Sequence, residues 1–549
     1  MNETHASAAP AASLMQPWPL TIDKILSHAA RWHPRVEIVS RHLDGSLQRA
    51  TYASVERRAR QLSAALLDGG IRPGDRVATL AMNSAEHVEA WYAIANLGAV
   101  CHTLNPRLFD EQLTYIINHA ADRWIIADAL FAPQLERLLP ACPCVERVVY
   151  IGAGAKPSVG RVPAIEYEAL IAGRPTDVRW GAFDENQPAG LCYTSGTTGH
   201  PKGVLYSHRS QVLHTLFASC ADGMGLTARD TILMVVPMFH ANAWGVPFSA
   251  AMVGTKLVLP GPKLDGESVY GLLEGERATV SCAVPTVWQL LLEHLRTRGL
   301  KLTTLKRVLI GGSACPDALI RAFEAHGVEV VHAWGMTEMS PIGTAACPSR
   351  EVAALPEAER HALRLKQGRV GLSVDMKITD DEGRALPHDG VQPGHVKVKG
   401  PCVIARYFRA EHEDVLDADG YFDTGDIGTI DAYGYLQITD RAKDLIKSGG
   451  EWISSVEVEN IAAGHPKTLM AAVIAVPHPK WRERPLLLVK LRPGEQATPQ
   501  EFLDYLDGKI ARWWMPDAVV FIEEIPLGGT GKIDKKRLRA QFAEAAKTA

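Results

Sequence analysis

The chain has 549 residues, of which 46% are apolar and 22% charged, and its net charge at pH 7 is -4. The length exceeds that of one ordinary domain, and the composition is typical of a globular protein. A charge this small excludes recruitment by nucleic acid or by an anionic membrane through a strong field, so we expect no nucleic acid as a partner.

The N-terminus and the cysteines bear on where the protein works. Residues 1–16 are rich in Ala, Ser and Pro and lack the basic and apolar regions of a signal peptide, so we predict a disordered tail. No apolar run is long enough to cross a bilayer, so we expect no integral membrane segment. The nine cysteines are scattered and odd in number, and no Cys or His pair completes a zinc site with Cys142 and Cys144. This usage indicates a reducing compartment, and we predict a cytoplasmic protein.

Strands and helices alternate between residues 76 and 151. We predict short buried strands at 76–82, 100–104, 124–127 and 147–151. Asn83 is expected to cap a helix after the first strand, since Glu86 follows three residues later. A second helix is predicted at 109–119. Strand, helix and strand at this spacing indicate a parallel sheet covered by helices.

The alternation of strands and helices resumes after residue 190, and near residue 368 it gives way to short strands and turns. We predict strands at 231–236, 256–259 and 308–310 and a helix at 287–295. Short strands and turns from about 368 to 440 indicate a small β-rich lobe. Beyond it, strands at 471–476, 486–491 and 519–522 and a helix at 499–511 indicate a compact mixed segment. The predicted fold class is therefore α/β, with a large N-terminal domain of parallel α/β sheets over 17–442 and a small α+β domain over 443–549.

The most informative stretch is Tyr193-Thr-Ser-Gly-Thr-Thr-Gly-His-Pro-Lys-Gly203. Its small hydroxyl residues and glycines allow backbone amides and hydroxyls to converge on an anion, and Lys202 adds a positive charge. It is not a Walker A loop, because Pro201 stands where that loop has its second glycine. An ordinary Gly- and Ser-rich loop is the alternative, and the ordered run of residues with a lysine weighs against it. The stretch predicts a phosphate-binding loop.

This stretch resembles the signature of the adenylate-forming superfamily of AMP-binding enzymes, which includes acyl-CoA synthetases, amino-acid adenylation domains and beetle luciferases. The resemblance covers roughly residues 20–545 and recurs in order at 311–316, 332–338, 421–427, 440–446 and 529–532. Residues 236–244, 254–261 and 447–454 are similar to bacterial medium- and long-chain fatty acyl-CoA synthetases in particular. The resemblance implies an acyl-CoA ligase that uses ATP, CoA and Mg²⁺, and a mobile C-terminal domain with a hinge at Lys443.

The resemblance also implies roles for individual residues. Lys532, Glu338 and Lys202 match catalytic positions, and Thr194 and Glu338 match the metal site. A carboxylate and a hydroxyl suit Mg²⁺, which prefers hard oxygen ligands. The remaining positions that match the family's ATP- and AMP-binding residues are Ser195, Gly196, Thr197, Thr198, Gly199, Gly312, Ala333, Trp334, Gly335, Thr337, Asp426, Arg441, Lys443 and Trp452.

Three of these positions have a specific expected task. Asp426 would accept hydrogen bonds from the ribose hydroxyls, because its two oxygens can take both donors. Trp334 would pack on adenine, and Arg441 would assist at the ribose or the phosphates. The alternatives are a turn cap for Asp426, a core side chain for Trp334 and a surface ion pair for Arg441.

The C-terminal motif places a lysine on a flexible loop. Lys532 follows several glycines, and such a loop can deliver its charge to the α-phosphate and withdraw it. We expect the next basic residues, Lys535, Lys536 and Arg537, to face solvent. Gly449 and Gly450 would approach the nucleotide or CoA near the hinge.

The acid is the least determined part of the prediction. His240, Trp244, Phe248, Met336 and Met339 are expected to line the acyl pocket, with Trp244 as a gate. Because these side chains are mostly apolar, we expect an acid with an apolar tail. The resemblance to fatty acyl-CoA synthetases implies a medium- or long-chain fatty acid, and a short thioether acid or an aryl acid is the alternative. The sequence leaves a monomer and a homodimer open.

Three other functions compete with that of a ligase. An amino-acid adenylation domain would carry an aspartate where this chain has His240. A luciferase-like oxygenase shares the adenylation step, and only its lower frequency among such proteins counts against it. A nucleotide-binding regulator on an inactive scaffold would be expected to lack Glu338 or Lys532, and both are present.

Overall fold

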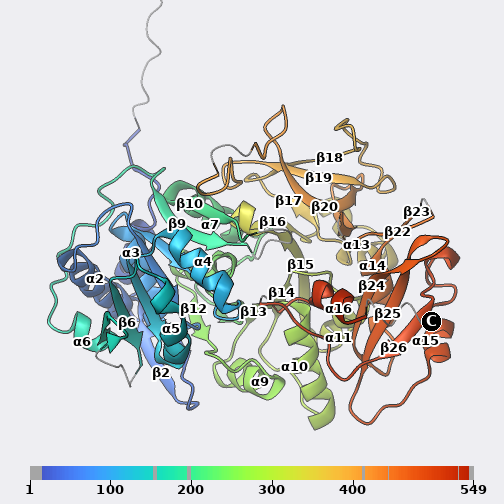
Figure 1. Cartoon of the computed structure of the whole chain (residues 1–549), viewed down its shortest axis with the longest axis horizontal. Helices are drawn as coiled ribbons and strands as arrows, with labels where there is room; N and C mark the ends of the chain where they lie inside the picture. Colours follow the sequence, from blue (N-terminus) through green and yellow to red (C-terminus); the bar gives the residue numbers. More distant parts are fainter. Residues whose placement is uncertain are drawn as a thin grey trace, which may run out of the picture.

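A computed structural model of the chain describes residues 15–152, 158–194, 200–410, 414–442, 444–449, 451–529 and 531–542. Within these residues the chain forms two large sheets, a small β-rich lobe and a C-terminal domain with a sheet of its own (Figure 1). No helix in the described residues is long and apolar enough to cross a membrane.

The first large sheet is mostly parallel and carries the predicted phosphate loop at its edge. Its strand order is β10-β9-β4-β3-β5-β6-β8-β7, and β9 and β10 form the hairpin that encloses this loop. The predicted strands at 76–82, 100–104, 124–127 and 147–151 are confirmed as β3, β4, β5 and β6. The strands are β3 (Arg76–Leu80), β4 (Val100–Thr103), β5 (Trp124–Asp128), β6 (Arg147–Ile151), β7 (Ser158–Val159), β8 (Val162–Glu166), β9 (Pro188–Tyr193) and β10 (Gly203–Ser207).

The second large sheet has a parallel centre with antiparallel strands at both edges. Its order is β17-β16-β15-β14-β13-β11-β12-β1-β2. The strands from β15 to β1 in this order, β15, β14, β13, β11, β12 and β1, pair in parallel. The strands are β1 (Glu37–Arg41), β2 (Leu47–Thr51), β11 (Thr231–Met234), β12 (Lys256–Leu259), β13 (Val280–Ala283), β14 (Arg307–Ile310), β15 (Glu329–Gly335), β16 (Ile342–Ala345) and β17 (Arg369–Val370). The predicted strands at 231–236, 256–259 and 308–310 are thereby confirmed.

Helices pack between and around the two sheets. They are α1 (Asp23–Trp32), α2 (Tyr52–Asp68), α3 (Ala85–Asn96), α4 (Asp110–Ala120), α5 (Ala132–Leu138), α6 (Tyr167–Ile171), α7 (His208–Ser219), α8 (Val246–Val253), α9 (Gly266–Gly275), α10 (Pro285–Arg298), α11 (Asp317–Ala325), α12 (Arg350–Ala353) and α13 (Glu357–Arg364). Short 3-10 turns lie at η1 (Ala129–Phe131), η2 (Leu139–Ala141), η3 (Ala241–Gly245) and η4 (Thr337–Met339). The main apolar core joins both sheets through α2, α3 and α8, and every residue of α3 is buried.

The start of α3 differs from the prediction. Ser84, and not Asn83, is the N-cap, and its hydroxyl accepts a hydrogen bond from the His87 amide. The Asn83 amide instead donates to the carbonyls of Met234 and Val236. A buried side-chain amide needs such partners, and here they link the two large sheets.

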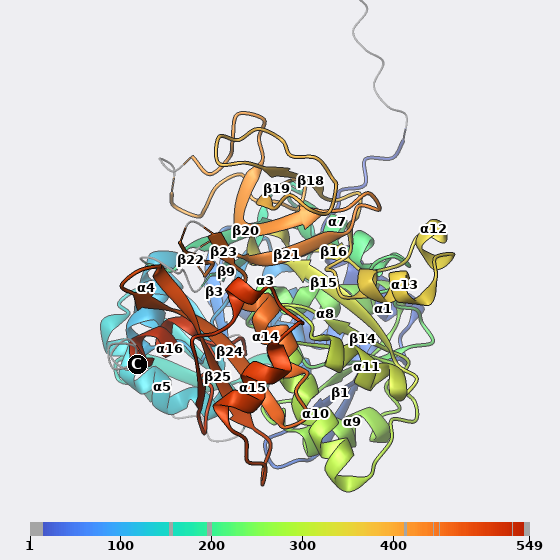
Figure 2. The same ribbon diagram turned by 90° about the vertical axis from the view of Figure 1, so that its right-hand side faces the viewer.

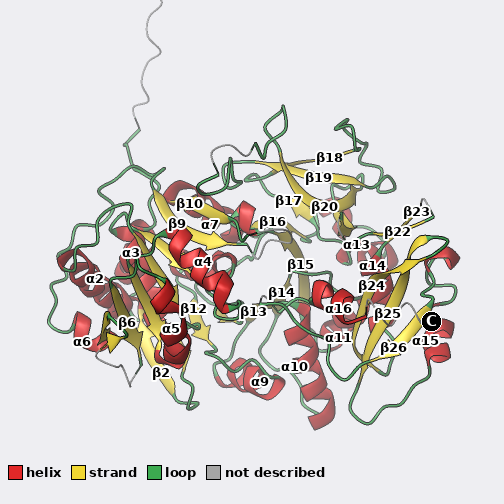
Figure 3. Cartoon of the chain, viewed as in Figure 1, coloured by secondary structure: helices red, strands yellow, loops and turns green. Residues whose placement is uncertain are grey.

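The lobe and the C-terminal domain complete the fold. Strands β18 (Asp375–Thr379), β19 (Gly394–Lys399), β20 (Phe422–Ile430) and β21 (Leu436–Arg441) form the antiparallel lobe (Figure 3). The C-terminal sheet is built from β22 (Ile446–Ser448), β23 (Glu451–Ile453), β24 (Thr468–His478), β25 (Arg482–Leu491) and β26 (Ala518–Phe521). Its further elements are α14 (Ser455–Ala463), α15 (Pro499–Leu506), η5 (Arg512–Trp514) and α16 (Lys535–Phe542).

The C-terminal sheet is covered on both faces. One apolar cluster joins α14 and α15 to the sheet, and another joins α16 to the opposite face (Figure 2). The helix predicted at 499–511 ends earlier, at Leu506, and is followed by Gly508 with a positive φ of 73°. Glycine adopts this left-handed backbone without strain, which favours ending the helix here.

Candidate active site

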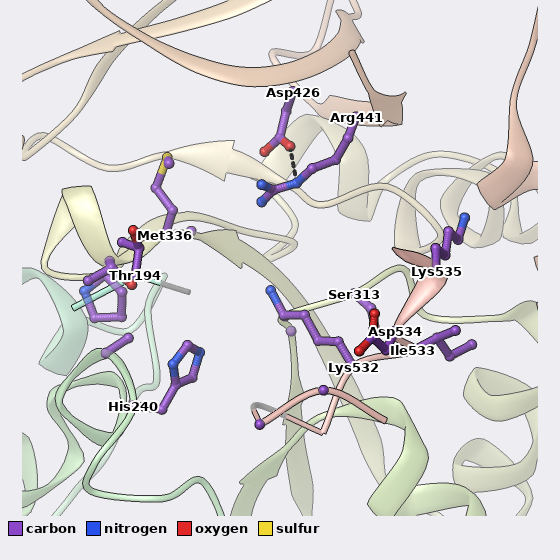
Figure 4. Close-up of a pocket in the computed structure, with 18 of the residues that line it drawn as sticks. Thr194, His240, Ser313, Met336, Asp426, Arg441, Lys532, Ile533, Asp534 and Lys535 are labelled. Atoms are coloured by element: carbon purple, nitrogen blue, oxygen red, sulfur yellow. Dashed lines mark ion pairs between the residues drawn. The ribbon is translucent and has the colours of Figure 1, made fainter. Parts of the chain in front are cut away.

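A cavity of about 1250 Å³ lies where the two sheets, the lobe and the C-terminal domain meet. Most residues predicted for the site line it, although they come from segments far apart in the sequence (Figure 4). These lining residues are Thr194, Lys202, His240, Trp244, Gly312, Ala333, Trp334, Gly335, Met336, Thr337, Glu338, Asp426, Arg441 and Lys532. The structure therefore gathers the motifs into one space.

A polar cluster forms one wall of this cavity. Asp426 on β20 and Arg441 on β21 are cross-strand partners, and the Arg441 Nε lies 2.9 Å from one Asp426 oxygen. The indole N–H of Trp334 donates to the other Asp426 oxygen at 2.8 Å. Each carboxylate oxygen has two lone pairs, so Asp426 retains acceptor capacity while holding both neighbours in place.

Glu338 lies in η4 on the neighbouring side of the cavity. Its carboxylate accepts a hydrogen bond of 2.9 Å from the hydroxyl of Tyr407, which the sequence analysis did not single out. The ammonium of Lys202 lies 4.9 Å from the centre of the Tyr407 ring. Burial raises the pKa of the Glu338 carboxyl, because the charged form is poorly solvated there.

The donors near Glu338 fit a magnesium ion that is held mainly by its substrate. In the described part of the chain, no three His, Cys, Asp or Glu side chains gather as a metal cage. One carboxylate and the nearby Thr194 side chain suit Mg²⁺, which usually takes its remaining ligands from phosphates and water. The Thr194 amide donates to the Lys202 carbonyl at 2.9 Å, which closes the base of the phosphate loop.

Lys532 reaches into the cavity from the C-terminal domain, as Figure 4 shows. It passes Gly312, whose φ of 85° favours glycine and where an added Cβ would lie 3.4 Å from the Lys532 Cε. Burial, with Lys532 and Arg107 nearby, lowers the pKa of His240 to about 3. His240 is therefore neutral at pH 7, and the positive charges near it come from Lys532 and Arg107.

The environment of the Lys535 side chain differs from the prediction. Its ammonium donates to the Ser455 hydroxyl at 2.6 Å and pairs with Glu459 at 2.8 Å at the edge of the cavity (Figure 4). The expectation that it faces solvent is wrong, because two α14 side chains provide partners that compensate its burial. Lys536 and Arg537 are exposed, as predicted.

A strained turn that was predicted to border the acyl pocket lines part of the cavity. Ala241, Asn242, Ala243 and Trp244 all have positive φ, between 44° and 56°, which non-glycine residues rarely adopt. The Trp244 ring lies close to Gly311, where an added Cβ would be 3.3 Å from it. The turn thereby places an indole against the backbone of the next motif.

Two residues assigned to the acyl pocket do not line the cavity in this structure. Phe248 packs against Trp91 and Tyr92 in the main core, with ring centres 5.7 and 5.5 Å away. Met339 is fully buried in a cluster with Val374 and other lobe residues. Both residues follow motif residues closely in the chain, and only the packing reveals that they lie behind the cavity wall.

The remaining assignments lie elsewhere or outside the described residues. Trp452 is 40% exposed and, like Gly449, does not line the cavity. Gly449 instead approaches the ring of Trp481, where an added Cβ would be 2.9 Å away. The positions outside the described residues are Ser195, Gly196, Thr197, Thr198, Gly199, Lys443 and Gly450.

One cavity is lined by Thr194 and Lys202 from the ends of the predicted phosphate loop, by the Glu338 carboxylate and by Lys532 from the C-terminal domain, and comparisons with known proteins identify the class of protein. Residues 26–408 match the model of AMP-binding enzymes, and residues 457–532 match that of the AMP-binding enzyme C-terminal domain. The chain belongs to the AMP-binding enzyme family and is an ATP-dependent acyl-CoA ligase, with ATP and CoA as co-substrates.

Individual relatives are similar over nearly their whole length. The chain is 49% identical over 533 residues to a 3-methylmercaptopropionyl-CoA ligase of Ruegeria lacuscaerulensis, covering 97% of this chain and 99% of the relative. It is 49% identical over 527 residues to a medium-chain-fatty-acid–CoA ligase of Ectopseudomonas oleovorans, covering 96% of each. A crystal structure of an anthranilate CoA ligase with anthranoyl-AMP has a TM-score of 0.87 at 25% identity, covering 97% of this chain and 99% of that one.

Proposed function

We propose that this ligase activates a short straight-chain acid of the size of 3-methylmercaptopropionate. The observation that carries the proposal is that Ala241 and Trp244 line the cavity, whereas Phe248 and Met339, which were expected to line a longer acyl pocket, do not. An acyl pocket bounded by Trp244 would have room for a short tail. The 3-methylmercaptopropionyl-CoA ligase at 49% identity supports this size.

In the proposed reaction, an oxygen of the acid's carboxylate attacks the α-phosphorus of ATP and pyrophosphate leaves. The thiolate of CoA then attacks the acyl carbon, AMP leaves, and the thioester forms. Lys532 would stabilise the charge at the α-phosphate, and Lys202 would attract the outer phosphates. Asp426 would hold the ribose and Trp334 the adenine, each oriented by the bond between them. Glu338 and Thr194 would hold Mg²⁺, which supplies charge neutralisation at the phosphates.

A medium- or long-chain fatty acid is the second candidate. The strained turn at 241–244 favours it, because residues held in sparsely populated backbone conformations often mark a segment with a second arrangement. If the turn relaxed and Trp244 moved aside, the space toward Phe248 could admit a longer tail. The medium-chain ligase at 49% identity supports this candidate.

A panel of acids separates the two candidates. CoA-dependent AMP release is measured with 3-methylmercaptopropionate, its near-isostere pentanoate, octanoate, hexadecanoate and benzoate. We expect kcat/KM to be highest for the first two acids and to fall by about tenfold or more by octanoate, since each misfitting methylene is worth about 1–3 kcal/mol. A kcat/KM that rises through octanoate to hexadecanoate would instead establish the fatty-acid candidate.

A further inference from the structure

The loop that carries Lys532 is held by side chains of the N-terminal body. The Thr286 hydroxyl donates to the Gly531 carbonyl at 3.1 Å. The Asn105 amide donates to the Gly529 carbonyl at 3.3 Å, and the Arg107 guanidinium approaches the same oxygen at 3.5 Å. These hydrogen bonds hold the backbone immediately before Lys532. The position of the Lys532 ammonium therefore depends on residues outside the C-terminal domain.

The same helix of the body meets the C-terminal domain at a second place. Thr286 lies at the start of α10, and Glu293 follows seven residues later, two helical turns along the same face. Glu293 pairs with Arg492 at the end of β25. Gln289, midway between them, lines both the main cavity and a crevice that Arg492 also lines. One face of α10 is thus the surface on which the C-terminal domain rests.

The places of Asn105 and Thr286 in the fold indicate that these contacts have a role besides stabilising the fold. Asn105 follows β4 at the carboxyl end of a parallel strand, and Thr286 occupies the equivalent place after β13, where ligand-contacting residues of such sheets gather. Among the described residues, both side chains donate to backbone carbonyls of the C-terminal domain, at Gly529 and Gly531. Such bonds can hold the loop whatever side chains it carries.

We propose that Thr286 and Asn105 are positioning residues that dock the Lys532 loop for adenylation and release it for the attack by CoA. This inference rests on the proposed two-step reaction. Each contact is a single hydrogen bond between partly exposed groups, which is strong enough to shift a two-state equilibrium and weak enough to break in each cycle. Loss of one should reduce the docked population by about fivefold to tenfold.

The test measures the two half-reactions separately in three variants, each with one substitution in α10. Thr286→Val removes the docking hydroxyl and keeps the shape, and Thr286→Ser restores a hydroxyl. Thr297→Val is the matched control, since the Thr297 hydroxyl donates to the Glu293 carbonyl within α10 itself. Adenylation is followed as acid-dependent pyrophosphate release without CoA. Thioester formation is followed from preformed acyl-adenylate and CoA.

We expect Thr286→Val to slow adenylation by about fivefold to tenfold and to leave thioester formation unchanged or faster. Thr286→Ser should recover most of the rate, Asn105→Ala should act in the same direction as Thr286→Val, and Thr297→Val should change neither step. Equal loss in both half-reactions, or full adenylation in Thr286→Val, would overturn the inference.

A measurement without turnover keeps this test independent of the proposed function. In the ligand-free protein, the Gly531 amide donates to the Gly528 carbonyl within the docked loop. Hydrogen exchange of residues 528–532 should accelerate in Thr286→Val and not in Thr297→Val. Unchanged exchange would contradict the docking role. Wild-type protein that releases no pyrophosphate with any acid would refute the proposed function and leave this result standing.

Discussion

At the scale of single residues, burial shifts the pKa values of side chains that line the cavity, and so affects which of them are charged before a ligand binds. Burial raises the pKa of Glu338 and lowers that of His240 to about 3, so both side chains are pushed toward their neutral forms. Basic side chains that line the cavity include Lys202, Arg441 and Lys532, and these are the groups proposed to meet the phosphates. A magnesium ion would favour the charged form of Glu338, so metal binding and deprotonation are coupled.

Glu338→Gln tests the proposed metal role. A neutral amide oxygen is a weaker ligand for a hard dication than a carboxylate, while the Tyr407 hydroxyl can still donate to it. We expect the Mg²⁺ concentration for half-maximal activity to rise by about tenfold or more and kcat to fall. A magnesium titration of both proteins measures this, and an unchanged titration with normal turnover would show that Glu338 is not a ligand.

A buried histidine far from the cavity predicts a pH dependence of stability. His87 donates from Nδ1 to the Met82 carbonyl, and its Nε2 accepts from the Trp91 indole, so the ring is neutral. Burial lowers its pKa to about 4. Because the unfolded pKa is near 6.5, the unfolded chain binds the extra proton first, and stability is lost as pH falls from about 6.5 toward 4.

Comparison with His87→Gln isolates this contribution. Between pH 7.5 and pH 5, the wild-type protein should lose about 2 kcal/mol of unfolding free energy that the variant does not lose. Urea titrations of both proteins at both pH values give the double difference. A difference between the proteins that stays constant with pH would mean that the pKa of His87 is the same in the folded and unfolded states.

At the scale of elements, the turn η3 has a strained backbone and borders the predicted acyl pocket. Left-handed residues other than glycine cost about 1–2 kcal/mol each, and four of them occur in succession from Ala241 to Trp244. The turn persists because its buried residues pack against the core and Trp244 lies close to Gly311. Such an element is suited to have a second arrangement.

Trp244→Ala tests whether the indole is the predicted gate. Without the ring, the acid should bind in the absence of ATP, and the range of accepted acids should broaden toward octanoate. The alternative is an ordinary core tryptophan, whose truncation costs about 3–5 kcal/mol of stability. Calorimetry of acid binding with and without a non-hydrolysable ATP analogue, together with thermal melts, separates the two. Earlier melting with the wild-type acid preference and ATP dependence would identify a core residue.

At the scale of the whole molecule, one of the proposed catalytic groups belongs to a different domain from the others. Lys532 enters the cavity from the C-terminal domain, whereas Glu338, Asp426 and Lys202 belong to the N-terminal body and its lobe. If Lys532 acts in adenylation as proposed, a movement of its domain would switch that step off while the other proposed nucleotide-binding residues stay in place.

Lys532→Ala tests this separation. Adenylation should fall by about 10²-fold or more, as for loss of a preorganised transition-state donor. Thioester formation from preformed acyl-adenylate should remain close to wild type. Rapid-quench measurements of each half-reaction decide the matter, and an equal loss in both would argue against an alternating C-terminal domain.

The amino-acid sequence by itself determined the class of fold and the chemistry of the site. Strands such as Val100–Thr103 and Lys256–Leu259 were predictable because apolar period and turn residues are local properties. The motifs carrying Glu338, Asp426 and Lys532 were recognised through their resemblance to the adenylate-forming superfamily, and their residue types suit phosphate and magnesium chemistry.

Only the tertiary structure decided which residues meet. Thr286 and Gly531 are 245 positions apart, yet a hydrogen bond joins them next to Lys532. Phe248 is adjacent in sequence to the acyl motif but lies behind its wall, and Lys535 is surrounded by basic residues but pairs with Glu459. Such outcomes depend on how helices and sheets from distant segments pack together, and local sequence patterns carry no information about that packing.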